Sequence, residues 1–236
     1  MRTVALLTDF GTRDPYVAAM KGVIASRCEA SIVDLTHDIA PFDVWEAAFF
    51  LRDVVRYWPA GTIFVCVVDP GVGTTRRILA VESDGWIFLA PDNGLLHFVR
   101  GDAYDVTEES LFLADGSTTF HGRDRFAPVA AAIANGTRIN ALGARVDDRV
   151  LLDYTPGAII RIDRYGNCVT DLVSPSTPFA AIVNDQRIDA IRTTYGGDGA
   201  FLIIGSTGCI EISVANGSAA SLLQLSRGDR VTIVLK

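Results

Sequence analysis

The chain has 236 residues, and its 28 acidic side chains outnumber the 21 basic ones, which gives a formal net charge of −7. This negative balance argues against a general affinity for nucleic acid or anionic membranes and favours a small-molecule ligand. No apolar run approaches the roughly 18 residues of a membrane-spanning helix. Because nothing in the sequence marks it for export, we expect a cytoplasmic protein.

The first 150 or so residues alternate strand and helix signals, which is typical of a parallel sheet wrapped by helices. After a first apolar strand, Asp14 and Pro15 predict a helix with aspartate as the N-cap and proline at the first helical position. Asp43 begins a second helix with a capping-box pattern. The predicted strands span residues 4–7, 32–35, 62–68, 78–82 and 86–90, and the predicted helices span 14–24, 43–57, a segment beginning at 92–94, and 128–133.

From about residue 157 the chain changes to short strands and turns, with no long helical period. We therefore expect an N-terminal α/β domain with a parallel sheet over residues 1–153, followed by a smaller, β-barrel-like C-terminal domain over residues 157–236. The boundary falls between Asp153 and Gly157. The strands expected in the second domain span residues 181–183, 188–191, 201–204, 209–214 and 231–235, the first two of them as a hairpin.

A polar cluster directly follows the most apolar strand of the first domain. Residues 62–68 form an almost uninterrupted β-branched and aromatic run, which is typical of a strand buried on both faces of a sheet. Asp69 follows at its carboxyl end, and Arg76 and Arg77 come after a glycine-rich turn. Ligands bind at this edge of open α/β sheets, so the acid and an arginine are a candidate reaction centre. An Asp-Pro turn with a solvated arginine pair remains the alternative.

Other polar clusters fall at residues 8–11 and 91–94, again at predicted strand ends, and at residues 119–124. The last of these contains His121, in a run too polar to be simple core, so His121 is a functional candidate beside the alternative of a structural histidine. His37 and His97 need only ordinary packing or solvation. The four cysteines lack metal-ligand spacing, and we expect small buried hydrophobic residues rather than zinc ligands or disulfides.

In the second domain, residues 162–167 place an acid, an aromatic ring and an amide at the end of a strand. An Asx-type turn explains Asp163. Asp163 and Asn167 can equally hold a zwitterion, because a carboxylate takes an ammonium group and an amide serves a carboxylate. The small, flexible turns at 206–208 and 215–217 suit backbone contacts with a flat base.

Six motifs follow one another along nearly the whole chain: LTDFG at residues 7–11, D-x-YVA-x-MKG at 14–22, DPGVGT at 69–74, APDNG at 90–94, FHGRD at 120–124 and D-x-YGN at 163–167. In this order they resemble the S-adenosyl-L-methionine (SAM) hydroxide adenosyltransferases. These proteins are hydrolase relatives of the bacterial fluorinase and chlorinase, and were long known only as a domain of unknown function.

The resemblance implies hydrolysis of SAM to adenosine and L-methionine. Water or hydroxide attacks the 5′ carbon of the ribose and expels methionine from the sulfonium. By the same resemblance, Asp69, Arg76 and His121 orient and deprotonate the water, and no metal or redox cofactor is required. The choice of Arg76 over Arg77 rests on spacing alone.

The resemblance also implies where the substrate binds. Asp9 takes the ribose hydroxyls, while Asp163 and Asn167 hold the amino and carboxylate groups of the methionine. The family binds this ligand between the first domain of one subunit and the second domain of a neighbour, so we expect a homotrimer, with no nucleic-acid or membrane partner. The expected substrate-binding residues are Asp9, Asp14, Phe42, Val72, Phe120, Asp163, Tyr165, Asn167, Ser206, Asn216 and Gly217.

Three alternatives stay open at this point. A SAM-dependent halogenase shares the fold and the ligand, but the fluorinase has tyrosines at the positions of Asp69 and His121, and a serine at that of Gly122. A non-catalytic module that senses SAM or a nucleoside is the second alternative. The third is a metal-dependent hydrolase with Asp9, Asp69, Asp92 and His121 as ligands, although arginine beside a divalent ion is electrostatically awkward.

Overall fold

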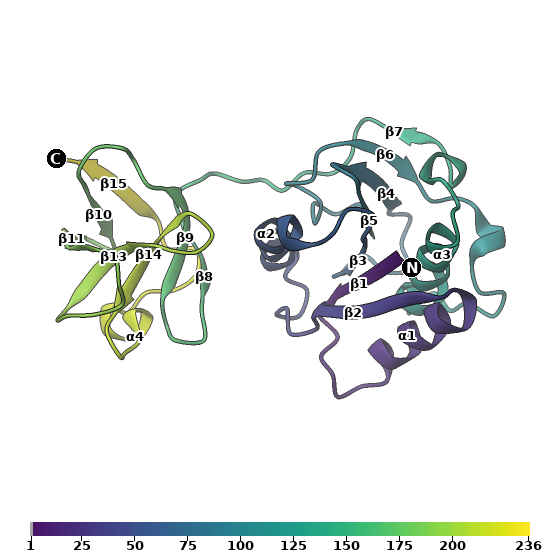
Figure 1. The fold of residues 1–236 in the computed structure, drawn as a ribbon, viewed down its shortest axis with the longest axis horizontal. Helices are drawn as coiled ribbons and strands as arrows, with labels where there is room; N and C mark the ends of the chain where they lie inside the picture. The colour runs from purple at the N-terminus through teal and green to yellow at the C-terminus, as the bar shows by residue number, and fades with distance from the viewer. Residues whose placement is uncertain (1) are drawn as a thin grey trace. The chain divides into compact units, whose positions relative to one another are not determined.

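The computed structural model describes residues 2–236, and the chain passes from one compact unit to another between Leu152 and Asp153 (Figure 1). The first unit is built on a seven-stranded sheet with the order β2-β1-β3-β5-β4-β6-β7. Its strands are β1 (Arg2–Thr8), β2 (Ala30–Thr36), β3 (Ile63–Val67), β4 (Ile78–Ser83), β5 (Trp86–Pro91), β6 (Asp102–Asp105) and β7 (Arg145–Val146), and its α-helices are α1 (Tyr16–Arg27), α2 (Val44–Val54) and α3 (Ala127–Ala134).

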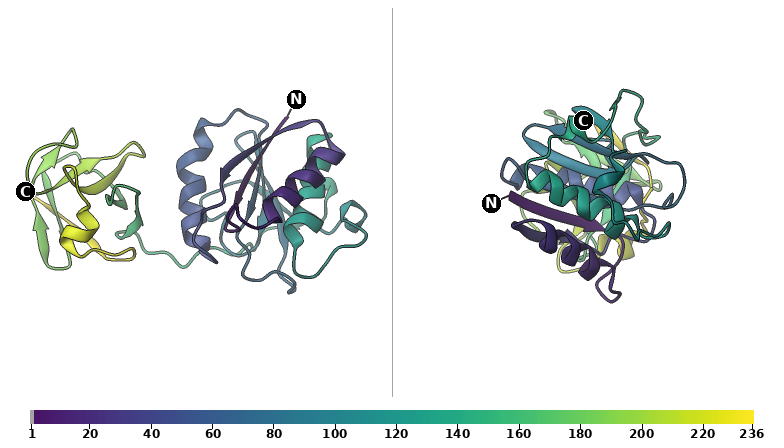
Figure 2. Two further views of the ribbon diagram at one scale, coloured as in Figure 1. Left: turned by 90° about the horizontal axis from the view of Figure 1, so that it is seen from below. Right: turned by 90° about the vertical axis from the view of Figure 1, so that its right-hand side faces the viewer.

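Helices cover both faces of this sheet, as Figures 1 and 2 show. Alternate residues of a strand point to opposite faces. In β1, Val4 and Leu6 accordingly pack with α1 and α3, whereas Ala5 and Leu7 pack with α2. All five residues of β3 are buried, which confirms the prediction of a strand enclosed on both faces.

The sheet is parallel only across β2, β1, β3 and β5. These four strands confirm the expected parallel sheet, and the strands beyond β5 extend it in the antiparallel sense, because β4 pairs with both β5 and β6 in that way. The turn between β4 and β5 explains the reversal. Asp84 and Gly85 have φ of 50° and 83°, and two successive residues of positive φ form the tight turn that joins hairpin strands.

Two predicted helix starts are wrong. Pro15, not Asp14, caps α1: no side chain caps this helix, and the Pro15 carbonyl accepts from the Ala19 N–H at 2.9 Å. Residues 92–94 form turns rather than a helix, because the Asn93 side chain binds backbone instead, donating from Nδ2 to the Val68 carbonyl at 2.9 Å. The start at Asp43 is confirmed, since its carboxylate accepts from the Glu46 N–H at 2.9 Å.

The second unit consists of two small sheets, with the orders β11-β10-β15 and β12-β13-β14-β9-β8, around one apolar core. The predicted hairpin is confirmed: β10 and β11 pair antiparallel across Asn184 and Asp185, both of positive φ. Among residues 2–236, no helix is long and apolar enough to cross a bilayer. The elements are β8 (Ile159–Ile162), β9 (Cys168–Val173), β10 (Phe179–Val183), β11 (Gln186–Ile188), β12 (Ile191–Arg192), β13 (Ala200–Ile204), β14 (Cys209–Val214), α4 (Ala219–Leu223) and β15 (Val231–Leu235).

Candidate active site

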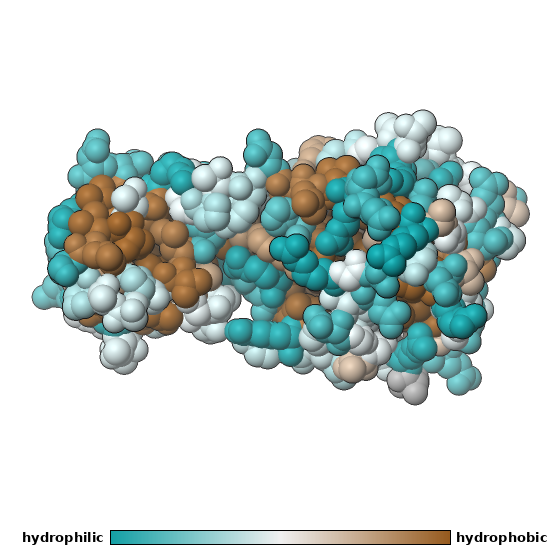
Figure 3. All heavy atoms as spheres, turned by 90° about the horizontal axis from the view of Figure 1, so that it is seen from above, coloured by the Kyte–Doolittle hydropathy of each residue, from teal (hydrophilic) through white to brown (hydrophobic). Residues whose placement is uncertain are grey.

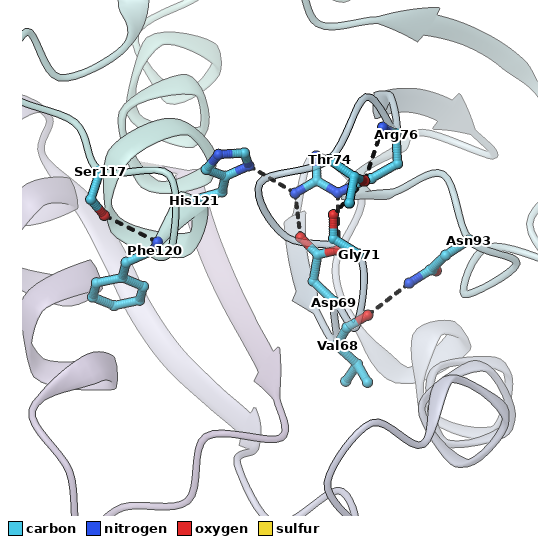
Figure 4. Close-up of polar contacts among 9 residues, drawn as sticks. All are labelled: Val68, Asp69, Gly71, Thr74, Arg76, Asn93, Ser117, Phe120 and His121. Carbon is cyan, nitrogen blue, oxygen red and sulfur yellow. Dashed lines mark hydrogen bonds and ion pairs between the residues drawn. The ribbon is translucent and has the colours of Figure 1, made fainter.

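Asp69 and Arg76 form a desolvated ion pair at the carboxyl end of β3. The loop after this strand turns back so that Arg76 Nε donates to Asp69 Oδ1 at 2.9 Å, while its Nη2 donates to Oδ2 (Figure 4). The two side chains are only 10% and 4% exposed. In a bidentate ion pair of this kind, two hydrogen bonds join the guanidinium to the carboxylate, which fixes the orientation of both groups and keeps both charged.

His121 completes the cluster from a separate segment: it is the N-cap of the π-helix Gly122–Phe126, which leads into α3. Its Nδ1 lies 2.9 Å from Arg76 Nη2. A guanidinium can only donate, so Nδ1 is the acceptor and the proton of the neutral imidazole is on Nε2. Burial lowers the pKa of His121, and the nearby Arg125 and Arg76 lower this pKa further. His121 is therefore neutral at neutral pH.

Two buried N–H groups in this cluster are left over. Within residues 2–236, neither Arg76 Nη1 nor His121 Nε2 has a hydrogen-bond partner, although both atoms are shielded from solvent. Orphaned buried donors are costly and call for an explanation. An oxygen-bearing ligand or nucleophile is the natural partner for such donors.

The loop that precedes His121 is held by a buried acid. Asp124 Oδ2 accepts from the Ser117 N–H at 2.7 Å and from Ser117 Oγ at 3.1 Å, and Ser117 Oγ in turn accepts from the Phe120 N–H at 3.1 Å. The same loop approaches the Asp69 loop closely: a Cβ on Gly73 would lie 2.6 Å from the Thr118 carbonyl oxygen. Backbone packing therefore sets the distance between the two loops.

Arg77 has a different set of partners from its neighbour. Its Nε donates to Asp92 Oδ2 at 2.8 Å, and its Nη1 donates to Asp148 Oδ1 at 2.7 Å. Asp92 Oδ1 also accepts from the Val150 N–H at 2.8 Å. Arg76 is thus the arginine in contact with Asp69, while Arg77 ties the end of β5 to residues 148–150.

The acidic residues considered as metal ligands are not brought together. Asp92 is engaged by Arg77, and Asp69 by Arg76. Across the part of the chain that the structure describes, no group of three or more histidine, cysteine or acidic side chains is placed to hold a metal ion. All four cysteines are free.

A cavity of about 220 Å³ opens beside this cluster. Three aromatic rings pack edge to face on its wall: Phe10 and Tyr16 are 5.7 Å apart, and Tyr16 and Phe120 are 5.1 Å apart. The exposed Asp14 is not among the residues that line it. The lining residues are Phe10, Tyr16, Val67, Asp69, Val72, Thr119, Phe120, His121 and Gly122.

Asp9 and Phe42 contact each other at the same end of the sheet. Asp9 Oδ2 accepts from the Phe42 N–H at 2.8 Å, and Phe42 is held at φ of 68° with its side chain 71% exposed. A non-glycine residue in this region of φ is strained, and such strain is maintained where the surroundings impose it. Asp9 Oδ2 thus holds the backbone of an exposed aromatic residue, and within residues 2–236 its Oδ1 makes no hydrogen bond.

A larger pocket, of about 600 Å³, lies within the second unit. Asp163 Oδ1 accepts from the Tyr165 and Asn167 N–H groups, each at 2.9 Å, and its Oδ2 accepts from Asn167 Nδ2 at 2.9 Å. The Asx turn is therefore present, and it also presents the acid and the amide together on the pocket wall. The lining residues are Asp163, Tyr165, Asn167, Tyr195, Val214, Asn216, Gly217 and Ser218.

Three lining residues of this pocket were not predicted from the sequence, Tyr195, Val214 and Ser218, and one predicted residue is absent from the lining. Tyr195 lies in a polar, glycine-rich loop, where its aromatic ring is the only signal. Val214 ends β14, and Ser218 follows a turn. Tyr195 donates its hydroxyl to the buried Glu211 at 2.9 Å. Burial, with Glu211 beside it, raises the pKa of Tyr195 to about 12. Ser206 is exposed and is not a lining residue.

Comparison with known proteins identifies the family of the chain. The SAM hydroxide adenosyltransferase N-terminal domain matches residues 4–143, and the C-terminal domain of the same family matches residues 157–232. The chain belongs to this family.

Relatives named (R)-S-adenosyl-L-methionine hydrolase are similar over the whole length. The protein from Thermus thermophilus is 36% identical over 99% of this chain and 100% of its own, and that from Salinispora tropica is 35% identical over 98% and 97%. A fluorinase from Actinopolyspora mzabensis is 31% identical but covers 65% of this chain and 61% of its own. The crystal structure of a conserved protein from Thermotoga maritima superposes with a TM-score of 0.91 at 30% identity, covering 98% of this chain and 100% of the other.

Proposed function

We propose that this protein hydrolyses SAM to adenosine and L-methionine. The observation that carries the proposal is the buried cluster of Asp69, Arg76 and His121, with its two unpartnered N–H groups, on the wall of a cavity at the carboxyl edge of the sheet. Full-length relatives named SAM hydrolases support the same substrate.

The chemistry needs an oxygen nucleophile held in line with the bond from the ribose 5′ carbon to the sulfonium sulfur. That sulfur is already an excellent leaving group, so the protein has only to position and deprotonate water. We assign Asp69 as the proton acceptor. His121 Nε2–H and Arg76 Nη1–H are donors that stabilise the oxygen as it gains hydroxide character. In the same step the new C–O bond forms while the C–S bond breaks, and the electron pair of that bond leaves on methionine sulfur.

The substrate-binding residues follow the same proposal. Asp9 has Oδ1 available for ribose hydroxyls while Oδ2 holds Phe42. Asp163 carries a negative charge suited to the ammonium group of the methionine, and the Asn167 amide serves its carboxylate. We assign Val72, Phe120, Tyr165, Asn216 and Gly217 as further contacts. Asp14 and Ser206 remain expectations from the family resemblance alone.

We also propose a cytoplasmic homotrimer with active sites at subunit interfaces. The family resemblance supports the trimer. Figure 3 shows hydrophobic residues gathered on one side of the second unit, and exposed apolar surface of this kind is typical of subunit contacts. Large hydrophobic residues exposed in this unit include Ile162, Val173, Ile191, Ile204, Leu222 and Leu235.

Product analysis tests the function. The protein is incubated with each sulfonium epimer of SAM separately, because the relatives are named for the (R) form. Each incubation is run with and without chloride, and with and without a metal chelator. We expect adenosine and methionine from the (R) epimer, unaffected by chloride or chelator. In an Asp69→Asn variant, we expect kcat to be lower by about 10²- to 10⁴-fold, the usual contribution of a general base.

The alternatives predict other products. Formation of 5′-chloro-5′-deoxyadenosine would assign the protein to the halogenases. If SAM binds but is recovered unchanged, the protein is a sensor. If the chelator abolishes activity, a metal-dependent hydrolase is favoured. Each of these outcomes contradicts the proposal.

A further inference from the structure

A buried histidine outside the catalytic cluster links three elements of the first unit. His37 follows β2, and its side chain is 2% exposed. Its Nδ1 lies 2.8 Å from Thr8 Oγ1 at the end of β1, and its Nε2 lies 3.0 Å from Asp34 Oδ1. Lys21 of α1 donates to Asp34 Oδ2 at 2.6 Å. None of these contacts takes part in the proposed chemistry.

Thr8 is the meeting point of two hydrogen bonds in this network. Its Oγ1 accepts from the Phe10 N–H at 3.2 Å and lies within hydrogen-bond distance of His37 Nδ1. The Asp34 carboxylate, 3.0 Å from Nε2, favours a proton on that nitrogen, and Nδ1 faces the Thr8 hydroxyl. Burial acts to raise the pKa of Asp34, but hydrogen bonds from Lys21 and His37 outweigh it and lower that pKa. Asp34 is thus the anion that orients the His37 ring.

The hydrogen-bond network of His37 extends to the cavity wall. The His37 carbonyl accepts from the Gly11 N–H at 2.8 Å, so His37 holds the turn after β1 by its backbone as well as through Thr8. This turn carries Asp9 and Phe10. The Phe10 ring packs against Phe120, with 5.9 Å between ring centroids, and lines the cavity together with Asp69.

We propose that His37 is a positioning residue: acting through Thr8, it fixes the turn of residues 8–11 so that the Phe10 ring and the Asp9 carboxylate stand ready for the substrate. Because these groups contact bound substrate and not the reacting oxygen, loss of the link raises KM and leaves kcat nearly unchanged. The kinetic part of this inference rests on the proposed function.

Two substitutions of His37 distinguish its contact with Thr8 from its contact with Asp34. Asn at position 37 places a polar atom near Nδ1, whereas Gln places one near Nε2, so His37→Asn keeps the Thr8 contact and His37→Gln loses it. Thr8→Val removes the hydroxyl with little change of shape, and Thr8→Ser is its matched control. For His37→Gln and Thr8→Val we expect KM for SAM to rise about three- to tenfold, the effect of one lost buried hydrogen bond. His37→Asn and Thr8→Ser stay near wild type.

Amide hydrogen exchange at Phe10 provides a readout that needs no turnover. We expect about tenfold faster exchange at this amide in His37→Gln and in Thr8→Val, with no further increase in the double variant, because both changes break one link. Unchanged Phe10 exchange would overturn the inference, and so would equal effects of the Asn and Gln variants or additive effects in the double variant. A fall in melting temperature with KM unaltered would also overturn it. If the wild-type protein fails to hydrolyse SAM, the proposed function fails, while the exchange experiment still decides the role of His37.

Discussion

Asp69 and Arg76 contact each other through two hydrogen bonds, and the same guanidinium reaches His121. One planar group therefore orders the acid and the imidazole at once. Lysine carries the same charge as a compact ammonium and cannot reproduce this fork. Arg77, one position further on, makes equally close contacts but to Asp92 and Asp148, so it is a natural control.

The Arg76→Lys variant tests this geometry. We expect kcat for SAM hydrolysis to fall by about ten- to a hundredfold, part of what removing one preorganised donor costs, with KM little changed. Arg77→Lys should lower the melting temperature and leave kcat within about threefold of wild type. Steady-state kinetics on both variants, with circular dichroism as the folding control, make the comparison. An Arg76→Lys variant with unchanged kcat would show that charge alone suffices at this position, and equal losses in the two variants would contradict the assignment of Arg76 to the catalytic cluster.

The protonation state of His121 predicts the pH dependence. Its pKa is lowered, and the protonated ring would place a second N–H against Arg76 and bring two cations together. Activity should therefore be constant at neutral pH and fall as the pH drops through the lowered pKa, which lies below the ordinary value of 6.5. A pH profile of kcat/KM checks this. An acidic limb with an apparent pKa above 6.5 would contradict the neutral His121.

Two loops bring the catalytic residues together, and their separation is set where Gly73 approaches the Thr118 carbonyl. Gly73 has φ of 80°, so alanine there adds both backbone strain and a collision. Gly136 also has a positive φ, of 104°, but nothing lies within 4 Å of a Cβ placed on it. Comparing alanine variants at these two positions therefore distinguishes the cost of backbone strain from the effect of displacing the loop.

Gly73→Ala should reduce kcat at least tenfold more than Gly136→Ala, because only the first change pushes the Asp69 loop away from His121. Both variants carry the cost of an L-residue at positive φ, about 1–2 kcal/mol of folding free energy. Thermal unfolding measures that shared cost, and initial rates at saturating SAM measure the difference. If the two alanine variants lose the same activity, the contact between the loops does not set the catalytic geometry.

The same elements show what the sequence can and cannot predict. The strand ending before Asp69 was predicted because its residues are apolar without interruption, and the Asp43 helix because its cap is local. Asp14 was misassigned because Pro15 itself takes the cap position. Spacing could not separate Arg76 from Arg77, since Asp69 is close in sequence to both and their other partners lie 15 to 71 residues away in the chain. The role of Tyr195 depends on a long-range contact with Glu211 that no local pattern encodes.

At the scale of the whole molecule, the candidate site residues belong to two units of one chain, divided near Leu152. The N-terminal unit holds Asp69 and the C-terminal unit holds Asp163. If each active site combines units from neighbouring subunits, two inactive variants can complement one another in a mixed trimer.

Mixed trimers of Asp69→Asn and Asp163→Ala test the proposed assembly. The two variants are unfolded, mixed in equal amounts, refolded together and assayed at SAM well below KM. Random assembly should restore about a quarter of wild-type activity, because each site is intact only when both of its contributing subunits supply the unmodified residue. Light scattering checks whether the refolded protein is a trimer. Activity no higher than the average of the separate variants would place each site within one subunit.

The central claim is that water attacks the 5′ carbon of SAM. Hydrolysis in water enriched in ¹⁸O, followed by mass spectrometry of both products, tests it most directly. We predict that the label enters adenosine at the 5′ oxygen and that methionine stays unlabelled. Label absent from adenosine, or products other than adenosine and methionine, would contradict the account.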